Sequence, residues 1–394
     1  MKKVIHNLLT IKKGMFFILL FGLISTLFFA CRQEKKFNDL LLEMADLPEA
    51  ERQYTVDLWV GQRVTFPVIE DSVVYFIYRN RADIPVYLSG DFNGWSPDSH
   101  PFLKVIGTDL YYNRQVFPED ARVEYKLIVG KNWQIDSLNV NVSRGGYGHN
   151  SLLFMPAYRF PLETLRQRNK VYTVPDTVTY RGGGLEYRAY IYRHSSAAAG
   201  APLLVFNDGG DYIRYGQAAV VLDNLTAEGR IPPVNAIFID AVDRMREYRF
   251  NAAYLERLMN EILPACEKQY QWRPEKVYMG GVSLGGLTAL YALKDYAATL
   301  DGVFSQSGSF WVDSLRIIEE LNGVNIKGET VFISYGHWEN QDENQQKVID
   351  FLRERKVRVK IRTFHDGHNW GNWSGALSDA LYFLLSPKEE HNGI

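Results

Sequence analysis

Residues 281–285 read Gly281-Val282-Ser283-Leu284-Gly285 and lie between an apolar run, KVYMG at 276–280, and a helix-like run, LTALYAL at 287–293. A serine in the tight turn from a strand into a helix exposes its hydroxyl. The flanking positions must be glycine because a Cβ there would collide with the neighbouring strand and helix. The N–H groups that begin the helix then stabilise a developing oxyanion. This stretch therefore predicts a nucleophile elbow with Ser283 as the nucleophile.

Predicted strands and helices alternate on both sides of this turn, after a hairpin at 177–192. The strands are expected at 203–206, 236–240, 277–279, 302–305, 330–334 and 359–364, and the helices at 252–270, 286–296, 314–321, 345–354 and 375–385. Such alternation requires a mostly parallel sheet covered by helices on both faces. With the elbow in its middle, the segment 157–390 is predicted to be an α/β-hydrolase domain.

A different pattern precedes this domain. Short β-rich runs lie at 73–78, 85–89, 110–116 and 123–129, separated by Gly, Asn, Asp and Pro turns, and they predict an all-β sandwich over 56–156. The stretches VYLSGDFNGWSP and VEYKLIVGKNWQID resemble early-set, immunoglobulin-like modules of the carbohydrate-binding type. That resemblance implies that Trp95 and Trp133 stack on sugar rings. Alternatively they fill the module's own core; we favour this for Trp95, and for Trp133 both interpretations stay open.

The first 31 residues indicate an export signal. Four lysines precede an uncharged run at 14–30, which ends at Cys31. The junction LFFAC resembles a bacterial lipoprotein box, which implies that Cys31 is lipidated and that a polar tether at 32–55 follows it. An uncleaved transmembrane anchor is the alternative, although the run is short for a span. We expect an exported lipoprotein anchored to a membrane, on the periplasmic or the cell-surface side.

Composition narrows the function classes. Lys and Arg total 44 against 46 Asp and Glu, so the net charge of −2 provides no field that attracts nucleic acid. With only two cysteines no disulfide framework is expected, and Cys266 lies in a helical pattern typical of a buried structural thiol. No cofactor and no metal are predicted, because the His365-x-x-His368 pair lacks a third ligand. Nothing indicates an oligomeric state.

A serine nucleophile needs a histidine base and a carboxylate that orients it, and in this fold both follow the serine in the chain. His368, in the loop FHDGHNWGNW after the last strand, is the expected base, and His365 is its rival at the strand end. Glu339 is the expected acid because it lies closest to the end of the preceding strand. Asp342 and Glu343 follow it, where acidic residues commonly begin a helix.

The oxyanion hole should combine two backbone N–H groups. One is that of Leu284, and the other belongs to the loop NDGGDY after the strand that ends at Phe206, from either Gly210 or Asp211. The glycines of this loop let the backbone approach a substrate closely.

Several ordered motifs together resemble the Putative esterase family of α/β-hydrolases: DGG, EGRIPPVNAIFIDAVDRMREYRFN, GGVSLGGLTALYAL, FSQSGSFW, the G-x-x-E at 336–339 and DGHNW. This family contains enterochelin esterases, feruloyl and acetylxylan esterases, and mycolyl transferases. The resemblance implies Ser283 as nucleophile, His368 as general base and then acid, and Glu339 as the orienting carboxylate.

Candidate substrate contacts come from three places in the chain. Arg244, Arg246 and Arg249 either meet an anionic catecholate or ferulate or form a solvated, ion-paired loop, and Trp370 and Trp133 are further candidates. The leading hypothesis is a serine esterase that acts on feruloyl or acetyl esters of a polysaccharide. A catechol siderophore ester is the alternative, and a catalytically inactive glycan-binding lipoprotein is the alternative from another class. Hydrolysis and acyl transfer share one acyl-enzyme, so both stay open.

Overall fold

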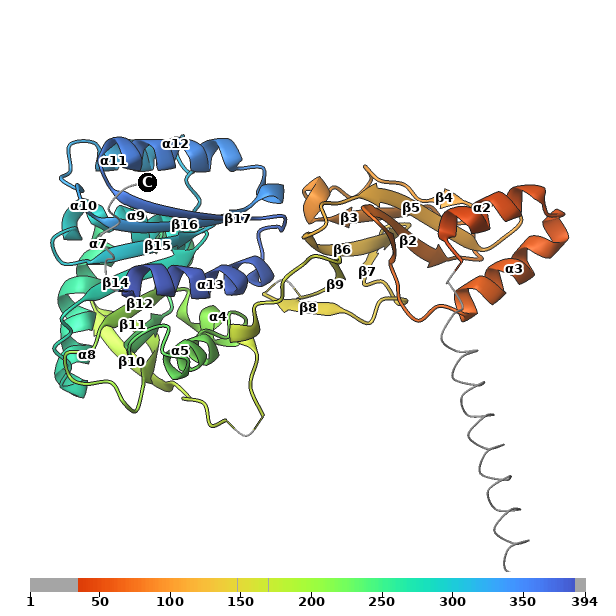
Figure 1. The fold of residues 1–394 in the computed structure, drawn as a ribbon. Helices are drawn as coiled ribbons and strands as arrows, with labels where there is room; N and C mark the ends of the chain where they lie inside the picture. The colour runs from red at the N-terminus through yellow and green to blue at the C-terminus, as the bar shows by residue number, and fades with distance from the viewer. Residues whose placement is uncertain (1–34, 147, 169, 387–394) are drawn as a thin grey trace, which may run out of the picture.

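The structure, a computed structural model, describes residues 35–146, 148–168 and 170–386; Cys31 and the predicted signal segment lie outside them. It has two parts: a mixed sheet flanked by helices, and a smaller β-rich part with two helices at its outer end (Figure 1). We call them the hydrolase domain and the β-module. Among the described residues, none of the helices combines the length and the apolar character needed to cross a bilayer.

The hydrolase domain is built on one eight-stranded sheet with the order β10-β11-β13-β12-β14-β15-β16-β17. The strands are β10 (Asp176–Gly182), β11 (Leu185–Arg193), β12 (Leu203–Asn207), β13 (Asn235–Ile239), β14 (Val277–Val282), β15 (Gly302–Gln306), β16 (Thr330–Gly336) and β17 (Arg358–Phe364). β10 pairs antiparallel with β11 and β11 antiparallel with β13, whereas the pairs from β13 to β17 are parallel. Because parallel strands end at the same edge, the loops after β14, β16 and β17 meet there.

Helices cover both faces of this sheet (Figure 1). They are α4 (Gly209–Arg214), α5 (Ala218–Ala227), α6 (Arg244–Glu247), α7 (Ala252–Glu256), the π-helix η3 (Arg257–Ile262), α8 (Leu263–Tyr270), α9 (Leu284–Tyr291), α10 (Leu293–Tyr296), α11 (Arg316–Leu321), α12 (Asp342–Glu354) and α13 (Trp370–Leu385). One buried cluster joins the sheet to α5 and α13, and a second joins its other face to α7, α8, α9, α11 and α12. This is the expected α/β architecture.

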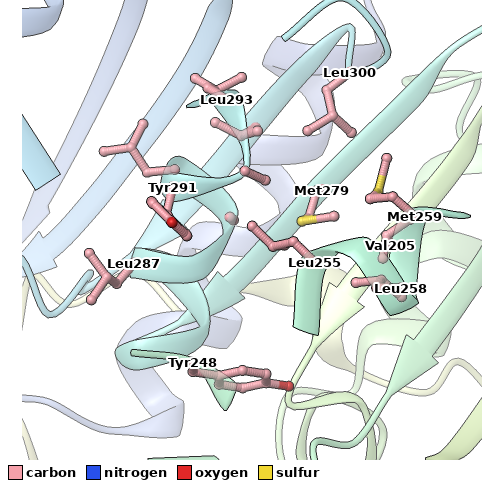
Figure 2. Packing of buried hydrophobic residues seen from close by; sticks show 14 of the residues in the cluster. Val205, Tyr248, Leu255, Leu258, Met259, Met279, Leu287, Tyr291, Leu293 and Leu300 are labelled. Carbon is pink, nitrogen blue, oxygen red and sulfur yellow. The ribbon is translucent and has the colours of Figure 1, made fainter. Parts of the chain in front are cut away.

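The helix that follows the elbow is buried on all sides. Leu287 and Tyr291 of α9 pack in the same cluster as Met279 of β14 and Leu255 of α7, as Figure 2 shows. Every residue of α9 is buried, which fits its almost wholly apolar sequence. Close packing therefore holds the first turn of α9, and with it the elbow, in place. Cys266 is a fully buried free thiol in the same cluster, as its helical pattern predicts.

The β-module consists of two antiparallel sheets. Their strands are β1 (Val68–Glu70), β2 (Val73–Arg79), β5 (Leu110–Val116) and β4 (Leu103–Lys104) in one sheet, and β3 (Val86–Gly90), β6 (Arg122–Val129), β7 (Asn132–Gln134), β9 (Gly148–Phe154) and β8 (Val142–Gly145) in the other. Side chains from both sheets, among them Phe76 of β2 and Leu127 of β6, share one buried cluster. Alternating apolar residues on strands of each sheet thus form a common core.

Two helices precede the β-module where the sequence predicted a polar tether over 32–55. They are α2 (Phe37–Asp46) and α3 (Glu49–Gly61). Phe37 is fully buried and contacts the rings of Trp59, Tyr75 and Tyr112. The tether prediction is therefore wrong for the described part of that segment. The short amphipathic stretch at 37–44 was assigned to the tether, whereas its apolar face packs against the module.

Candidate active site

The elbow after β14 has the strained geometry that its sequence predicts. Ser283 has φ 55° and ψ −119°, a backbone conformation that residues other than glycine rarely adopt. A Cβ at Gly281 would lie 2.5 Å from the carbonyl carbon of Gly285, and one at Gly285 would lie 2.8 Å from Asp208 Oδ2. The Ser283 hydroxyl bonds to Ser309 Oγ at 3.2 Å. The glycines are therefore required by the tight packing of strand, loop and helix around the serine.

The histidine and the acid form a bonded pair beside this serine. His368 Nδ1 lies 2.8 Å from Glu339 Oε2, and the Glu339 side chain is only 2% exposed. Glu339 Oε1 accepts hydrogen bonds from the Gly336 N–H and the Ser307 hydroxyl, both at 2.6 Å, and from the Asn372 amide at 3.3 Å. Fixed on three sides, the carboxylate orients the imidazole through Nδ1 and leaves Nε2 for proton exchange.

The rival residues lie elsewhere. His365 Nδ1 is 2.7 Å from Asp120 Oδ1 of the β-module, so it faces the domain boundary. Asp342 begins α12 and pairs with His337 at 2.9 Å, and Glu343 pairs with Lys347 at 2.6 Å. These contacts agree with the helix-start interpretation of the two acids. Glu339, by contrast, lies in the short helix η4 (His337–Glu339) directly after β16.

Of the three backbone N–H groups predicted for the oxyanion hole, one is available and two already donate hydrogen bonds elsewhere. Leu284 is the first residue of α9, where N–H groups have no partner within the helix. The Gly210 N–H donates to Asp240 Oδ1 at 2.7 Å, and the Asp211 N–H donates to the Asp208 carbonyl at 3.2 Å. In this structure neither of them is free to be the second donor. The sequence could not show this, because Asp240 belongs to the end of a different strand.

One cavity of about 630 Å³ joins the serine to the β-module. Its lining residues are Asp91, Trp95, Glu124, Lys126, Trp133, Arg144, Gly145, Gly146, Gly148 and Asn150 from the β-module, and Asp208, Asp211, Arg244, Val282, Ser283, His368, Asn369, Trp370 and Trp373 from the hydrolase domain. The candidate catalytic groups thus open into a space that two domains enclose. Sequence reasoning placed the module beside the catalytic domain and did not predict this shared wall.

Both predicted tryptophans of the β-module line this cavity. Their ring centroids lie 6.4 Å apart with an interplanar angle of 31°, and Trp133 is 45% exposed. The Trp95 indole N–H donates to Asp91 Oδ1 at 3.2 Å. The preferred interpretation of Trp95 as a core residue of the module is wrong, because its half-buried ring lies in the wall of the cavity beside that of Trp133.

Cations of different kinds approach the cavity. Arg244 forms a two-pronged ion pair with Asp208, at 2.7 and 2.9 Å, and burial raises the pKa of that carboxyl although Arg244 opposes the shift. Lys126 and Arg144 of the β-module also line the cavity, and within the described residues no ion pair is recorded for either. Arg246 is exposed outside the lining, and Arg249 pairs with Asp313 at 2.5 Å. Of the predicted arginine cluster, only Arg244 reaches the cavity.

Two tryptophans of α13 complete the wall beside the histidine. Trp373 meets the His368 ring edge-on at 4.9 Å and donates from its indole N–H to Ser307 Oγ at 2.8 Å. Trp370, a predicted substrate contact, lines the cavity next to it, with its ring 5.0 Å from that of Trp373. Ser307, Ser309 and Trp373 were missed as site residues. The motifs FSQSGSFW and DGHNWGNW contained them, without indicating which side chains turn inward.

Comparison with known proteins identifies the family. Residues 184–384 match the family described as Putative esterase. The chain belongs to this family. The prediction of a carboxylic ester hydrolase of this kind is thereby confirmed at the level of the family.

Iron(III) enterobactin esterases are among the chain's sequence relatives. The chain is 30% identical over 216 residues to the Iron(III) enterobactin esterase of Dickeya dadantii, covering 49% of either chain. It is 28% identical over 271 residues to the Iron(III) enterobactin esterase of Escherichia coli K12, covering 64% of this chain and 67% of that protein. The match thus spans about half to two thirds of the length of these curated relatives.

Solved structures show the same fold over both parts. The enterobactin esterase of Shigella flexneri, crystallised in the presence of enterobactin, superposes with a TM-score of 0.70 at 23% identity, covering 83% of this chain and 97% of that one. The ferric enterobactin esterase of Salmonella typhimurium gives a TM-score of 0.70 at 20% identity, covering 83% and 98%. At this identity the likeness concerns the fold.

Proposed function

We propose that this protein hydrolyses an ester of a catecholate siderophore, with Ser283, His368 and Glu339 as its catalytic triad. The observation that carries the proposal is the cavity itself. In it, the candidate nucleophile and base face two tryptophans and two cations that come from the other domain. A small acetyl ester needs no such wall, whereas a large aromatic anion does.

The roles of the triad follow from its geometry. His368 takes the proton of the Ser283 hydroxyl through Nε2 as the oxygen attacks the ester carbonyl carbon, and then gives it to the leaving alkoxide. Glu339, bonded to Nδ1 at 2.8 Å, stabilises the imidazolium formed in both steps. The Leu284 N–H at the start of α9 supports the oxyanion. Water then attacks the acyl-enzyme. His368 takes a proton from the water and afterwards gives it to the Ser283 oxygen as the acyl bond breaks.

The substrate class follows from the chemistry of the wall. A catechol ring presents a flat face that suits the Trp95 and Trp133 indoles, and its ionised oxygens suit Lys126, Arg144 and the partly exposed Arg244. The chain is similar in sequence to proteins named as enterobactin esterases, and structures of that name share its fold over 83% of its length. We accordingly place the siderophore before the polysaccharide ester that the sequence favoured.

A feruloyl ester is the second candidate, because it also offers an aromatic ring to the tryptophan pair. The early-set, carbohydrate-binding resemblance of the β-module would then have the module hold the polysaccharide that carries the ferulate. An inactive glycan-binding protein is disfavoured by the complete set of Ser283, His368 and Glu339. The serine would have no reason to keep its strained elbow in a protein without chemistry.

A hydrolysis panel tests the proposal. The full chain is assayed with ferric and iron-free enterobactin, methyl ferulate and acetylated xylan, and Ser283→Ala is the blank. We expect the highest kcat/KM for an enterobactin form. A preference for methyl ferulate or acetylated xylan would overturn the substrate assignment, and no serine-dependent hydrolysis of any ester would overturn the proposed function.

We also propose that the protein is exported and held at a membrane through lipid on Cys31. The support is the sequence alone: a basic start, an uncharged run and the junction LFFAC. A stable anchor needs more than one acyl chain, which lipoprotein maturation supplies. Radiolabelled fatty acid should enter the wild-type protein and not Cys31→Ser, and equal labelling of the two would contradict the anchor.

A further inference from the structure

A network of five polar side chains, four of them buried and one, Asn369, half-buried, lies where the β-module meets the loop that carries His368. Asp91, Arg122 and Glu124 come from the module, and Asp366 and Asn369 come from the loop. The two loop residues stand two positions before and one position after His368. None of the five belongs to the proposed triad, yet together they contact the chain on both sides of the candidate base.

Arg122 is the centre of this network. Its Nη1 donates to Asp366 Oδ1 at 3.0 Å and to Asn369 Oδ1 at 2.8 Å, and its Nη2 donates to Glu124 Oε1 at 2.6 Å. Its backbone N–H donates to the His365 carbonyl at 3.0 Å. The Arg122 side chain is 6% exposed and that of Asp366 is 3% exposed. One arginine of the module thus binds three successive points of the catalytic loop.

Two glycines of the loop are shaped to receive the module. A Cβ at Gly367 would lie 2.3 Å from Asp91 Cγ, and a Cβ at Gly371 would lie 2.0 Å from Arg122 Cζ. A side chain at either position would therefore force Asp91 or Arg122 of the module to move. His368 lies between these glycines, and its loop is therefore pressed against module side chains before and after it.

The charges of the network explain why the arginine matters. Three buried carboxyl groups surround one guanidinium, and burial raises the pKa of Asp366 to about 6 although Arg122 opposes the shift. Burial and the neighbouring carboxylates raise the pKa of Asp91 well above its ordinary value. Asn369 also bridges Asp366 at 2.9 Å and Asp91 at 3.2 Å. Without Arg122 the acids would repel one another at the base of the loop.

We propose that Arg122 is a positioning residue, through which the β-module sets the place of the His368 loop and so completes the triad. The inference rests on the proposed function of that triad. Asp91 extends the connection to the substrate wall, because it also accepts the Trp95 indole N–H. The module then contributes to turnover as well as to binding. A displacement of the imidazole by about 1 Å is enough to cost about 10²-fold in rate.

The test compares Arg122→Ala with Arg79→Ala in the full chain. Arg79 belongs to the same module and pairs with Asp109 and with Asp57 of α3, the helix at the outer end of the module (Figure 1), so it controls for the loss of a module ion pair. We expect kcat for a small soluble ester to fall about 10²-fold in Arg122→Ala and little in Arg79→Ala, with KM nearly unchanged in both. Arg122→Lys should recover only part of kcat, because an ammonium keeps the positive charge but cannot reproduce the forked geometry of a guanidinium.

A spectroscopic reading needs no substrate. The strongly deshielded proton between His368 Nδ1 and Glu339 should be seen by NMR in the wild type and in Arg79→Ala, and should be shifted or broadened in Arg122→Ala. If that resonance is unchanged in Arg122→Ala, or if both variants lose the same kcat, Arg122 is structural and the proposal is wrong. If the wild type cleaves no ester, the proposed function fails while the resonance still decides the positioning role.

A double-mutant cycle with Arg122→Lys covers the case in which Arg122→Ala does not fold well. Gly371→Ala should impair the resonance and kcat when Arg122 is present, because the new methyl group displaces the guanidinium. In the Arg122→Lys background the same change should cost less, because the guanidinium that the methyl group displaces is absent. Equal costs in every background would overturn the proposed contact.

Discussion

The two walls of the cavity are built by different means. On the hydrolase side, one short stretch of chain produces the elbow, and buried neighbours hold it in a strained turn. On the module side, the wall combines residues of β6, β7, β8 and the loop at Trp95, which are spread over more than fifty positions of sequence. The first wall is a local device that works through close packing. The second is a tertiary surface, and it determines what reaches the first.

The largest effect should come from the hydrolase wall. Ser283→Ala should lower kcat by about 10⁵-fold on every ester, because nucleophile and base act as one unit. Folding should be retained, since alanine fits wherever serine does. A serine-directed phosphonate, followed by mass spectrometry, should label the wild type at Ser283 alone. Substantial turnover by the alanine variant would show that the hydrolase wall does not supply the nucleophile.

The second-largest effect on kcat should come from the candidate acid, Glu339. Glu339→Gln should lower kcat by about 10³-fold to 10⁴-fold, because the amide cannot stabilise the imidazolium. Asp342→Asn is the matched control, since its carboxylate pairs with His337 on the surface and should cost almost nothing. Steady-state kinetics on one soluble ester decide the matter. A larger loss in Asp342→Asn than in Glu339→Gln would show that the acid was assigned wrongly.

The module wall can be weakened through its stability. Phe37→Ala removes a fully buried ring that contacts Trp59 and Tyr75, and should lower the free energy of unfolding of the module by about 3–5 kcal/mol. Leu42→Ala, in the same helix and 62% exposed, should change it little. Urea unfolding followed by tryptophan fluorescence measures both. Equal free energies of unfolding of the two variants would show that this segment is a tether and does not stabilise the module.

The smallest predicted effect concerns the substrate face of the module. Trp133→Ala should raise KM for an aromatic ester by about 2-fold to 12-fold, since ring stacking contributes about 0.5–1.5 kcal/mol. The kcat should stay nearly the same, because the indole does not touch the reacting atoms. A small acetyl ester is the control substrate, and its KM should not change. If both substrates lose equally, the tryptophan supports the wall without recognising the ring.

The sequence placed the candidate nucleophile, acid and base of the hydrolase half at the ends of strands. A nucleophile elbow, a carboxylate at the end of one strand and a histidine after the last strand are all tied to strand ends, and parallel strands bring those ends to one edge. That is why Ser283 and His368 line one cavity in the structure, with Glu339 bonded to His368. The helices α2 and α3 were missed because a short amphipathic pattern between polar residues also suits a tether.

What only the tertiary structure decided lies at the domain boundary and in the side chains that compete for a partner. The N–H of Gly210 is taken by Asp240, Trp95 turns into the cavity, and Arg122 reaches the loop of His368 across 246 positions of sequence. Local spacing carries no information on such contacts, because they depend on how two separately patterned domains pack. The sequence alone determined the chemistry of this protein through local backbone requirements, whereas packing between domains decided the surroundings in which that chemistry takes place.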